Sequence, residues 1–168
     1  MDRVVLIGFM GVGKSTVAKH LAKILRCEKL DLDDYIEENE KLSPAEIITL
    51  YGEKFFRELE TKYLKKALET EAKVIALGGG TWAKEQNRKM IMQSGCVTVW
   101  LMSTFDRCWL NIKASNKRRP LAADREKAAE LFAEREKLYC LADLHIPIPS
   151  HATSQEIARI IAEAVFKI

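Results

Sequence analysis

The feature that most constrains the fold is a glycine-rich segment, Gly8 to Thr16 (GFMGVGKST), which lies between two apolar patterns. The residues before it, Val4 to Ile7, are continuously apolar, as is typical of a strand that is buried on both faces. From Thr16 to Arg26 the apolar residues recur at helical spacing along one stripe. The sequence therefore predicts a strand, a tight glycine loop and a helix in direct succession.

Within this segment Gly8, Gly13, Lys14 and Ser15 match G-x-x-x-x-G-K-[ST], the pattern of a phosphate-binding P-loop. Small residues let backbone N–H groups approach phosphate oxygens, and the first turn of the helix adds free donors and the positive end of its dipole. The lysine of such a loop reaches the β- and γ-phosphates, and the serine hydroxyl coordinates Mg²⁺. We expect a nucleotide to contact Gly11, Val12, Gly13, Lys14, Ser15 and Thr16.

Composition is that of an ordinary globular chain. The 168 residues suffice for one domain over 1–168, and the charged fraction of 30% and hydrophobic fraction of 48% are typical values. A net charge of +3 is too small to indicate nucleic acid, and no apolar stretch is long enough to span a membrane. The four cysteines form no C-x-x-C pair, and glycines interrupt the N-terminal apolar run. We expect reduced thiols, no signal peptide and a cytoplasmic monomer that binds small molecules.

Apolar runs and helical patterns alternate along the whole chain. Strand candidates occur at 4–7, 28–32, 73–77, 96–102 and 144–148, and helical patterns at 16–26, from 35 to a break at Gly52, and at 53–70, 84–93, 104–114, 127–141 and 154–166. Five strands joined by helical crossovers predict a three-layer α/β/α fold with a five-stranded parallel sheet. Pro147 places the last strand at a sheet edge. Ligands of such folds bind at the carboxyl ends of the strands.

The residues that follow the other strands narrow the class of nucleotide-binding protein. Guanine recognition usually needs N-K-x-D, and residues 116–119 read NKRR, without the aspartate. Motor-type ATPases end an apolar strand with an aspartate, but strand 73–77 runs into Gly78, Gly79 and Gly80. Acidic residues, Asp31 and Asp33, instead follow the second predicted strand. This pattern favours a small-molecule kinase.

The two aspartates are two residues apart, so in an extended segment both carboxylates face the same side. One can then hold Mg²⁺ through water while the other accepts a hydrogen bond from an acceptor hydroxyl. The alternative is an acidic, solvated turn that continues into Asp34.

Three arginines are candidates for binding anions. Arg57 lies three residues before Glu60, at helical spacing, which fits either a surface salt bridge or a guanidinium oriented for a substrate carboxylate. Arg135 stands between Glu134 and Glu136, which on its own indicates a solvated helix face. Arg119 lies in a basic segment without apolar periodicity, 115–125, which fits either a solubilising loop or a mobile lid that closes over the transferred phosphoryl group.

Taken together, these motifs resemble the shikimate kinase family in order, spacing and total length, over essentially the whole chain. The shared set is Gly8-x-x-Gly11-x-Gly13-Lys14-Ser15, Asp31-x-Asp33, Phe56-Arg57-x-x-Glu60, Gly78-Gly79-Gly80, Arg119-Pro120-Leu121 and Arg135-x-x-x-Tyr139. The resemblance implies a P-loop kinase fold, substrate-binding helices at about 33–62 and a mobile lid at about 115–125.

The resemblance also implies the reaction and the role of each residue. The reaction is in-line transfer of the γ-phosphoryl group of ATP to the 3-hydroxyl of shikimate, in the biosynthesis of chorismate and aromatic amino acids. The implied catalytic residues are Lys14, Asp33 and Arg119, with Asp33 as the base; the metal site is Ser15 with Asp31 through water; the substrate contacts are Asp33, Arg57, Gly78, Gly79, Gly80 and Arg135. The alternatives are a kinase for another polyol acid such as gluconate, or a non-catalytic nucleotide-binding regulator.

Three features depart from the family pattern. The lid looks short, since residues 121–124 run quickly into a helix. Trp82 stands where family members usually carry a small or aliphatic residue, so its effect on the acceptor pocket is open. The arginine that members commonly place against adenine is missing from 109–113 on the helix that enters the lid. Either Trp109 stacks on the base with Lys113 beside it, or Trp109 belongs to a core stripe that also contains Phe105, Cys108 and Ile112.

Overall fold

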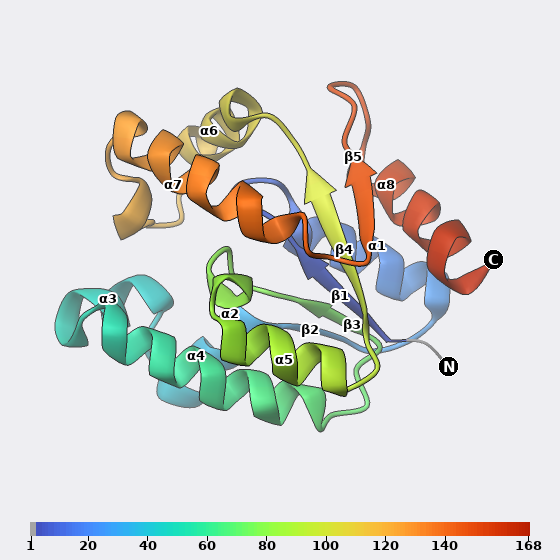
Figure 1. Cartoon of the computed structure of the whole chain (residues 1–168), viewed down its shortest axis with the longest axis horizontal. Coiled ribbons are helices and arrows are strands. Elements are labelled where there is room, and N and C mark those ends of the chain that lie inside the picture. The colour runs from blue at the N-terminus through green and yellow to red at the C-terminus, as the bar shows by residue number, and fades with distance from the viewer. Residues whose placement is uncertain (1–2) are drawn as a thin grey trace.

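A computed structural model describes residues 3–168 of the protein (Figure 1). Its centre is a five-stranded, fully parallel sheet in the order β2-β3-β1-β4-β5. The strands are β1 (Val4–Ile7), β2 (Lys29–Asp31), β3 (Val74–Ala76), β4 (Val97–Met102) and β5 (Leu144–Pro147). The predicted sheet is therefore confirmed, and Pro147 does lie in an edge strand, where its missing N–H breaks no ladder.

Helices cover both faces of the sheet, which confirms the three-layer architecture. The helices are α1 (Lys14–Leu25), α2 (Leu32–Glu40), α3 (Pro44–Tyr51), α4 (Glu53–Leu68), α5 (Glu85–Gln93), α6 (Phe105–Ala114), α7 (Arg125–Tyr139) and α8 (Ser154–Ile161), with the 3₁₀ turns η1 (Thr81–Ala83) and η2 (Pro120–Ala122). The chain ends in a π-helical turn, η3 (Ala162–Phe166).

The core divides into two parts because successive strand residues point to opposite faces. Val4 and Leu6 of β1 pack with the apolar stripes of α1 and α8 on one side of the sheet. Val5 and Ile7 face the larger cluster on the other side, to which α2 to α7 contribute. Figure 1 shows α3 and α7 beyond the carboxyl ends of the strands, where the predicted ligand site lies.

The structure differs from the sequence predictions at two functional segments. Helix α2 begins at Leu32, because Asp31 caps it by accepting hydrogen bonds from the backbone N–H groups of Asp33 and Asp34 at 3.1 and 3.3 Å. The prediction that Asp31 and Asp33 share an extended segment is therefore wrong: the first ends β2 and the second lies in the first helical turn.

The segment 115–125 is the second difference. It is not wholly irregular, since it contains η2, and Ala122 is buried against the larger core cluster. The prediction that this segment lacks apolar anchors is therefore wrong at Ala122. Its mobility stays a prediction. Within residues 3–168, no helix combines the length and the hydrophobicity that a membrane crossing requires.

Candidate active site

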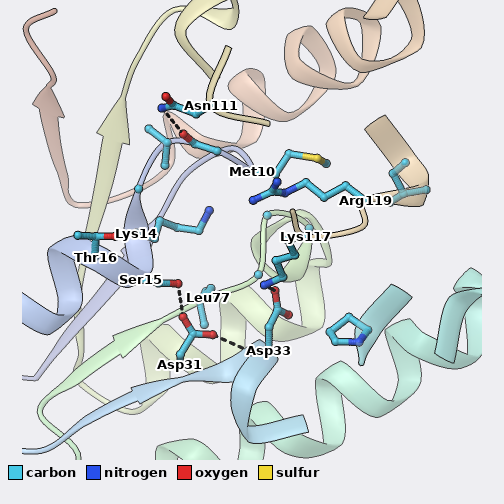
Figure 2. Close-up of a pocket in the computed structure, with 18 of the residues that line it drawn as sticks. Met10, Lys14, Ser15, Thr16, Asp31, Asp33, Leu77, Asn111, Lys117 and Arg119 are labelled. Carbon is cyan, nitrogen blue, oxygen red and sulfur yellow. Dashed lines mark hydrogen bonds and ion pairs between the residues drawn. The ribbon is translucent and has the colours of Figure 1, made fainter. Parts of the chain in front are cut away.

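One cavity of about 650 Å³ at the carboxyl ends of the strands brings together all the predicted site residues (Figure 2). They come from the P-loop, the β2–α2 junction, α4, the loop after β3, the segment between α6 and α7, and α7 itself. They are Gly11, Val12, Gly13, Lys14, Ser15, Thr16, Asp31, Asp33, Arg57, Gly78, Gly79, Gly80, Arg119 and Arg135.

The P-loop end of the cavity is built mainly from backbone. Gly11 and Gly13 have φ angles of 79° and 103°, which residues with a side chain rarely adopt, and a Cβ on Gly11 would lie 2.6 Å from the carbonyl oxygen of Cys108. Gly13 caps α1 without any side-chain hydrogen bond, so the first N–H groups of this helix remain available to a ligand. This end can bind an anion.

Lys14 lies inside the same loop. Its ammonium donates to the carbonyl oxygens of Gly8 at 2.6 Å and Phe9 at 3.1 Å, and only 8% of the residue is exposed. Burial lowers the pKa of Lys14 to about 8, while the nearby charges of Asp33 and Asp31 oppose that shift. The lysine therefore gains most from a ligand that brings further negative charge to the loop.

The carboxylate of Asp31 joins the P-loop helix to α2. Its Oδ2 accepts a hydrogen bond from the hydroxyl of Ser15, and its Oδ1 accepts the two N–H groups of α2 (Figure 2). These contacts on both oxygens hold the carboxylate in one orientation beside the phosphate loop.

Asp33, two residues further on in the first turn of α2, points into the cavity, and its side chain is 24% exposed. Burial raises the pKa of Asp33 to about 6, and the positive charge of Lys117 opposes the shift. The Nζ of Lys117 lies 3.7 Å from Oδ2 of Asp33, so the segment between α6 and α7 reaches across the cavity to this carboxylate (Figure 2).

Arg57 is held on two sides by carboxylates of its own helix. Its Nη1 donates to Oε1 of Glu60 at 2.9 Å, and its Nη2 lies 3.4 Å from Oε1 of Glu53. Glu60 is 1% exposed, so this is not a solvated surface pair. The structure thus favours an oriented guanidinium over a plain surface salt bridge.

Arg135 is buried, with 6% exposure, and lines the cavity. The prediction of a solvated helix face, made from its neighbours Glu134 and Glu136, is therefore wrong. Adjacent residues on a helix point in different directions, and Arg135 lies on the face of α7 that packs inward. Among residues 3–168 no carboxylate forms an ion pair with it. A buried guanidinium without a counter-ion is costly, which indicates an anionic ligand at this end.

The glycine run lies between these two arginines. A Cβ on Gly80 would lie 2.6 Å from Cζ of Arg57, and one on Gly79 would lie 3.4 Å from Nη1 of Arg135. A side chain at Gly80 would displace the guanidinium of Arg57, whereas the distance at Gly79 is an ordinary contact with Arg135.

Arg119 enters the cavity from the side opposite Asp31, above Lys14 and Lys117 (Figure 2). Its Nη1 is buried and has no hydrogen-bond partner among the described residues. Such an unsatisfied donor is expensive, so it also indicates an oxygen-rich ligand between the loop and this arginine.

The remaining part of the cavity, beside the P-loop, contains residues that the sequence did not reveal. Arg107 of α6 donates to the carbonyl oxygens of Pro149 and Ala152, and Asn111 donates to the carbonyl oxygen of Gly11 at 2.7 Å. Residues 109–113 contain no arginine, but Arg107 lies two residues before them on the same helix and lines the cavity, so the helix after Thr104 does carry an arginine.

Trp109 does not line this cavity. Its ring packs on that of Phe105, with centroids 6.1 Å apart, and against the larger core cluster, while the ammonium of Lys113 lies 5.3 Å from its centroid. The structure supports the core interpretation for Trp109, and neither it nor Lys113 lines the cavity.

A P-loop that faces an oriented carboxylate, the buried Arg135 and the partly buried Arg57 and Arg119 within one cavity defines a nucleotide-dependent kinase for a small anionic acceptor. A family model described as "Shikimate kinase" matches residues 10–166. A shikimate kinase of Alkaliphilus oremlandii (strain OhILAs) is 40% identical over 163 residues, which cover 95% of this chain and 96% of that protein. The chain belongs to the shikimate kinase family and is a phosphotransferase.

Solved structures of the family agree with this assignment. A shikimate kinase from Acinetobacter baumannii in complex with shikimate superposes with a TM-score of 0.92 at 29% identity, covering 99% of this chain and 94% of that one. The shikimate kinase from Aquifex aeolicus vf5 gives a TM-score of 0.81 at 33% identity, covering 97% and 98%. The predicted P-loop kinase fold is therefore confirmed.

Proposed function

We propose that this protein transfers the γ-phosphoryl group of ATP to the 3-hydroxyl of shikimate, which yields shikimate 3-phosphate and ADP for chorismate and aromatic amino-acid biosynthesis. The observation that carries the proposal is Arg135, a buried cation without a carboxylate partner that lies in the same cavity as the P-loop. Its carboxylate counter-ion would be supplied by the acceptor, and the relative solved with shikimate bound supports that acceptor.

The triphosphate of ATP binds the backbone N–H groups from Gly11 to Thr16, with Lys14 on the β- and γ-phosphates. Arg119 then covers the γ-phosphate from the lid, 115–125, so that its buried and unpartnered Nη1 meets phosphate oxygens. The adenine extends toward Arg107 and Asn111, since the other direction along the cavity leads to the acceptor groups.

The oxygens at the P-loop suit Mg²⁺. The hydroxyl of Ser15 and the carboxylate of Asp31 are hard oxygen donors in direct contact, and the carboxylate is already oriented by the N–H groups of α2. Ser15 would hold the ion directly and Asp31 through water. When bound, Mg²⁺ neutralises charge on the phosphate oxygens during transfer.

The acceptor lies between the two arginines, the glycine run of 78–80 and Asp33. Arg57 and Arg135 bind its carboxylate, while Asp33 accepts a hydrogen bond from the 3-hydroxyl and takes its proton. The hydroxyl oxygen forms a bond to the γ-phosphorus as the bond to the bridging β–γ oxygen breaks, and ADP leaves with those electrons. A hydroxyl that binds at Oδ2 of Asp33 would displace Lys117, whose Nζ lies 3.7 Å from that oxygen.

The proposed working unit is one cytoplasmic monomer and one domain, with substrate helices at about 33–62. A single chain supplies every residue of the cavity, and its four cysteines are free thiols.

The test is a product analysis by ³¹P NMR and mass spectrometry after incubation with Mg·ATP, with and without shikimate. We expect one equivalent of shikimate 3-phosphate for each ADP and negligible ADP without acceptor. ADP release at the same rate with and without shikimate, or nucleotide binding without any product, would contradict the proposal.

A further inference from the structure

Trp82 is the largest of the fully buried side chains, with 1% exposure, and no step of the proposed reaction uses it. It lies in η1, two residues after the glycine run that lines the acceptor end of the cavity.

The indole of Trp82 is hydrogen-bonded to the helix that carries Arg135. Its Nε1 donates to the carbonyl oxygen of Leu138 at 2.8 Å. Leu138 lies in the last turn of α7, and its carbonyl oxygen also accepts a hydrogen bond from the backbone N–H of Leu141 at 3.1 Å. In the opposite direction, the hydroxyl of Tyr139 donates to the carbonyl oxygen of Gly79 at 2.5 Å. Two hydrogen bonds of opposite direction therefore join the end of α7 to the glycine run and η1.

The turn η1 is itself fixed from the other side. Nη1 of Arg88 on α5 donates to the carbonyl oxygens of Trp82 at 2.9 Å and Ala83 at 2.8 Å. Asn87, which is fully buried, donates to the carbonyl oxygen of Thr81 at 2.9 Å. Trp82 thus connects a turn held by α5 to the C-terminal turn of α7.

Arg135 depends on this connection more than Arg57 does. Arg57 is oriented by two carboxylates of its own helix, Glu53 and Glu60. Arg135 has no carboxylate partner among residues 3–168, and its side chain interacts with the hydroxyl of Tyr139 in the next turn of the same helix. The position of the last turn of α7 therefore affects where its guanidinium lies. It sits three residues before Leu138 and four before Tyr139, on the same helical face as both anchors.

We propose that Trp82 is a positioning residue for the acceptor: its indole N–H fixes the last turn of α7 and thereby aims Arg135 at the acceptor carboxylate. This inference rests on the proposed function, because it requires that Arg135 bind the carboxylate of the acceptor.

The test is Trp82→Phe, which keeps an aromatic ring and removes the N–H donor. We expect the KM for shikimate to rise roughly three- to tenfold, as for the loss of one hydrogen bond, with kcat and the KM for ATP within about twofold of wild type. Trp109→Phe is the matched control, because it replaces a tryptophan that packs outside the cavity, and it should leave all three constants unchanged.

A double-mutant cycle separates positioning from a general loosening of the pocket. The Arg135→Lys variant lacks the planar guanidinium that Trp82 is proposed to position. In that background Trp82→Phe should therefore raise the KM for shikimate by less than about twofold. A full additional rise in that background, or an unchanged KM in the single variant, overturns the inference. If Trp82→Phe does not fold, Trp82→Met, which also lacks the indole N–H donor, takes its place and should give the same pattern.

The wild-type protein, assayed beside these variants, distinguishes the two possible failures. Absence of shikimate-dependent ADP release in wild type contradicts the proposed function itself. An active wild type with an unaffected Trp82→Phe contradicts only the role of Trp82.

Discussion

The two ends of the cavity are built in opposite ways. The phosphate end comes from one continuous stretch, Gly8 to Thr16, and offers mainly backbone N–H groups at the start of α1. The acceptor end is assembled from side chains of α2, α4 and α7, which meet only because the sheet brings their segments together. A site made of backbone needs a local conformation, whereas a site made of side chains needs the whole fold.

Glycines show how differently the two ends tolerate change. At Gly11 an added Cβ would meet the backbone carbonyl of Cys108, which cannot move without disturbing α6. At Gly80 it would meet the guanidinium of Arg57, the far end of a flexible side chain. The phosphate end is therefore rigid, and the acceptor end can be adjusted by single substitutions that leave the fold intact.

The largest expected effect is that of Asp33→Asn at the acceptor end. The amide cannot take the proton of the acceptor hydroxyl, so kcat should fall by about 10³-fold or more. Mg·ATP affinity, measured by calorimetry without acceptor, should stay within about threefold if the two ends act separately. Glu37→Gln, an exposed carboxylate one turn further along α2, is the control. Near-normal turnover of Asp33→Asn would show that another group is the base.

Arg119→Ala tests the residue that spans both ends. Loss of a donor that stabilises charge developing on the phosphoryl group should lower kcat about 10²- to 10³-fold. ATP affinity without acceptor should change little, because the contact strengthens in the transition state. Arg159→Ala on the exposed face of α8 provides the comparison. A large loss of ATP affinity with unchanged kcat would instead make Arg119 a ground-state contact.

Substitution of Arg57 or Arg135 should weaken the binding of the acceptor and leave the binding of ATP unchanged. Arg57→Lys and Arg135→Lys retain the charge but lose the planar fork, so each should raise the KM for shikimate by about 5- to 150-fold, or 1–3 kcal/mol. The KM for ATP should not follow. Steady-state kinetics with each substrate varied in turn measures this, with Arg159→Lys as the control. Equal increases in the KM for shikimate and the KM for ATP would contradict the conclusion that the two ends of the cavity bind different substrates.

Asp31→Asn should weaken the metal site without removing the cap of α2, because asparagine also caps helices well. We expect the Mg²⁺ concentration at half-maximal rate to rise about tenfold, the size typical for residues that orient a metal ligand. Activity should recover at saturating Mg²⁺. A loss that added Mg²⁺ does not restore would contradict the metal role.

The smallest expected effect is that of Gly80→Ala. Displacement of the Arg57 guanidinium should raise the KM for shikimate about threefold, with little change in melting temperature, since the backbone of Gly80 has an ordinary φ of −108°. Gly11→Ala should instead lower the melting temperature and ATP affinity together. Identical outcomes for the two substitutions would contradict the contrast between a rigid and an adjustable end.

The same contrast explains what the sequence could reveal. The P-loop, its flanking strand and helix, and the parallel sheet follow from local patterns and were predictable. The acceptor end was identified only through the family resemblance, since each of its motifs is weak alone.

Three side chains of the acceptor end could not be placed from the sequence. Arg135 between two glutamates looked solvated because a short pattern does not show which helical face packs inward. The position of Asp33 was misjudged because the cap formed by Asp31 starts α2 early. Lys117, in a basic loop, gave no signal of its contact with Asp33.

The decisive experiment compares the rates of ADP release with shikimate, quinate and gluconate as acceptors at saturating Mg·ATP. We expect kcat/KM for shikimate to exceed that for either alternative by at least about 10²-fold, because loss of one paired contact costs about 1–3 kcal/mol and the two arginines, Asp33 and the glycine run all act on one acceptor. Comparable rates with gluconate, or ADP release that no acceptor accelerates, would contradict this expectation.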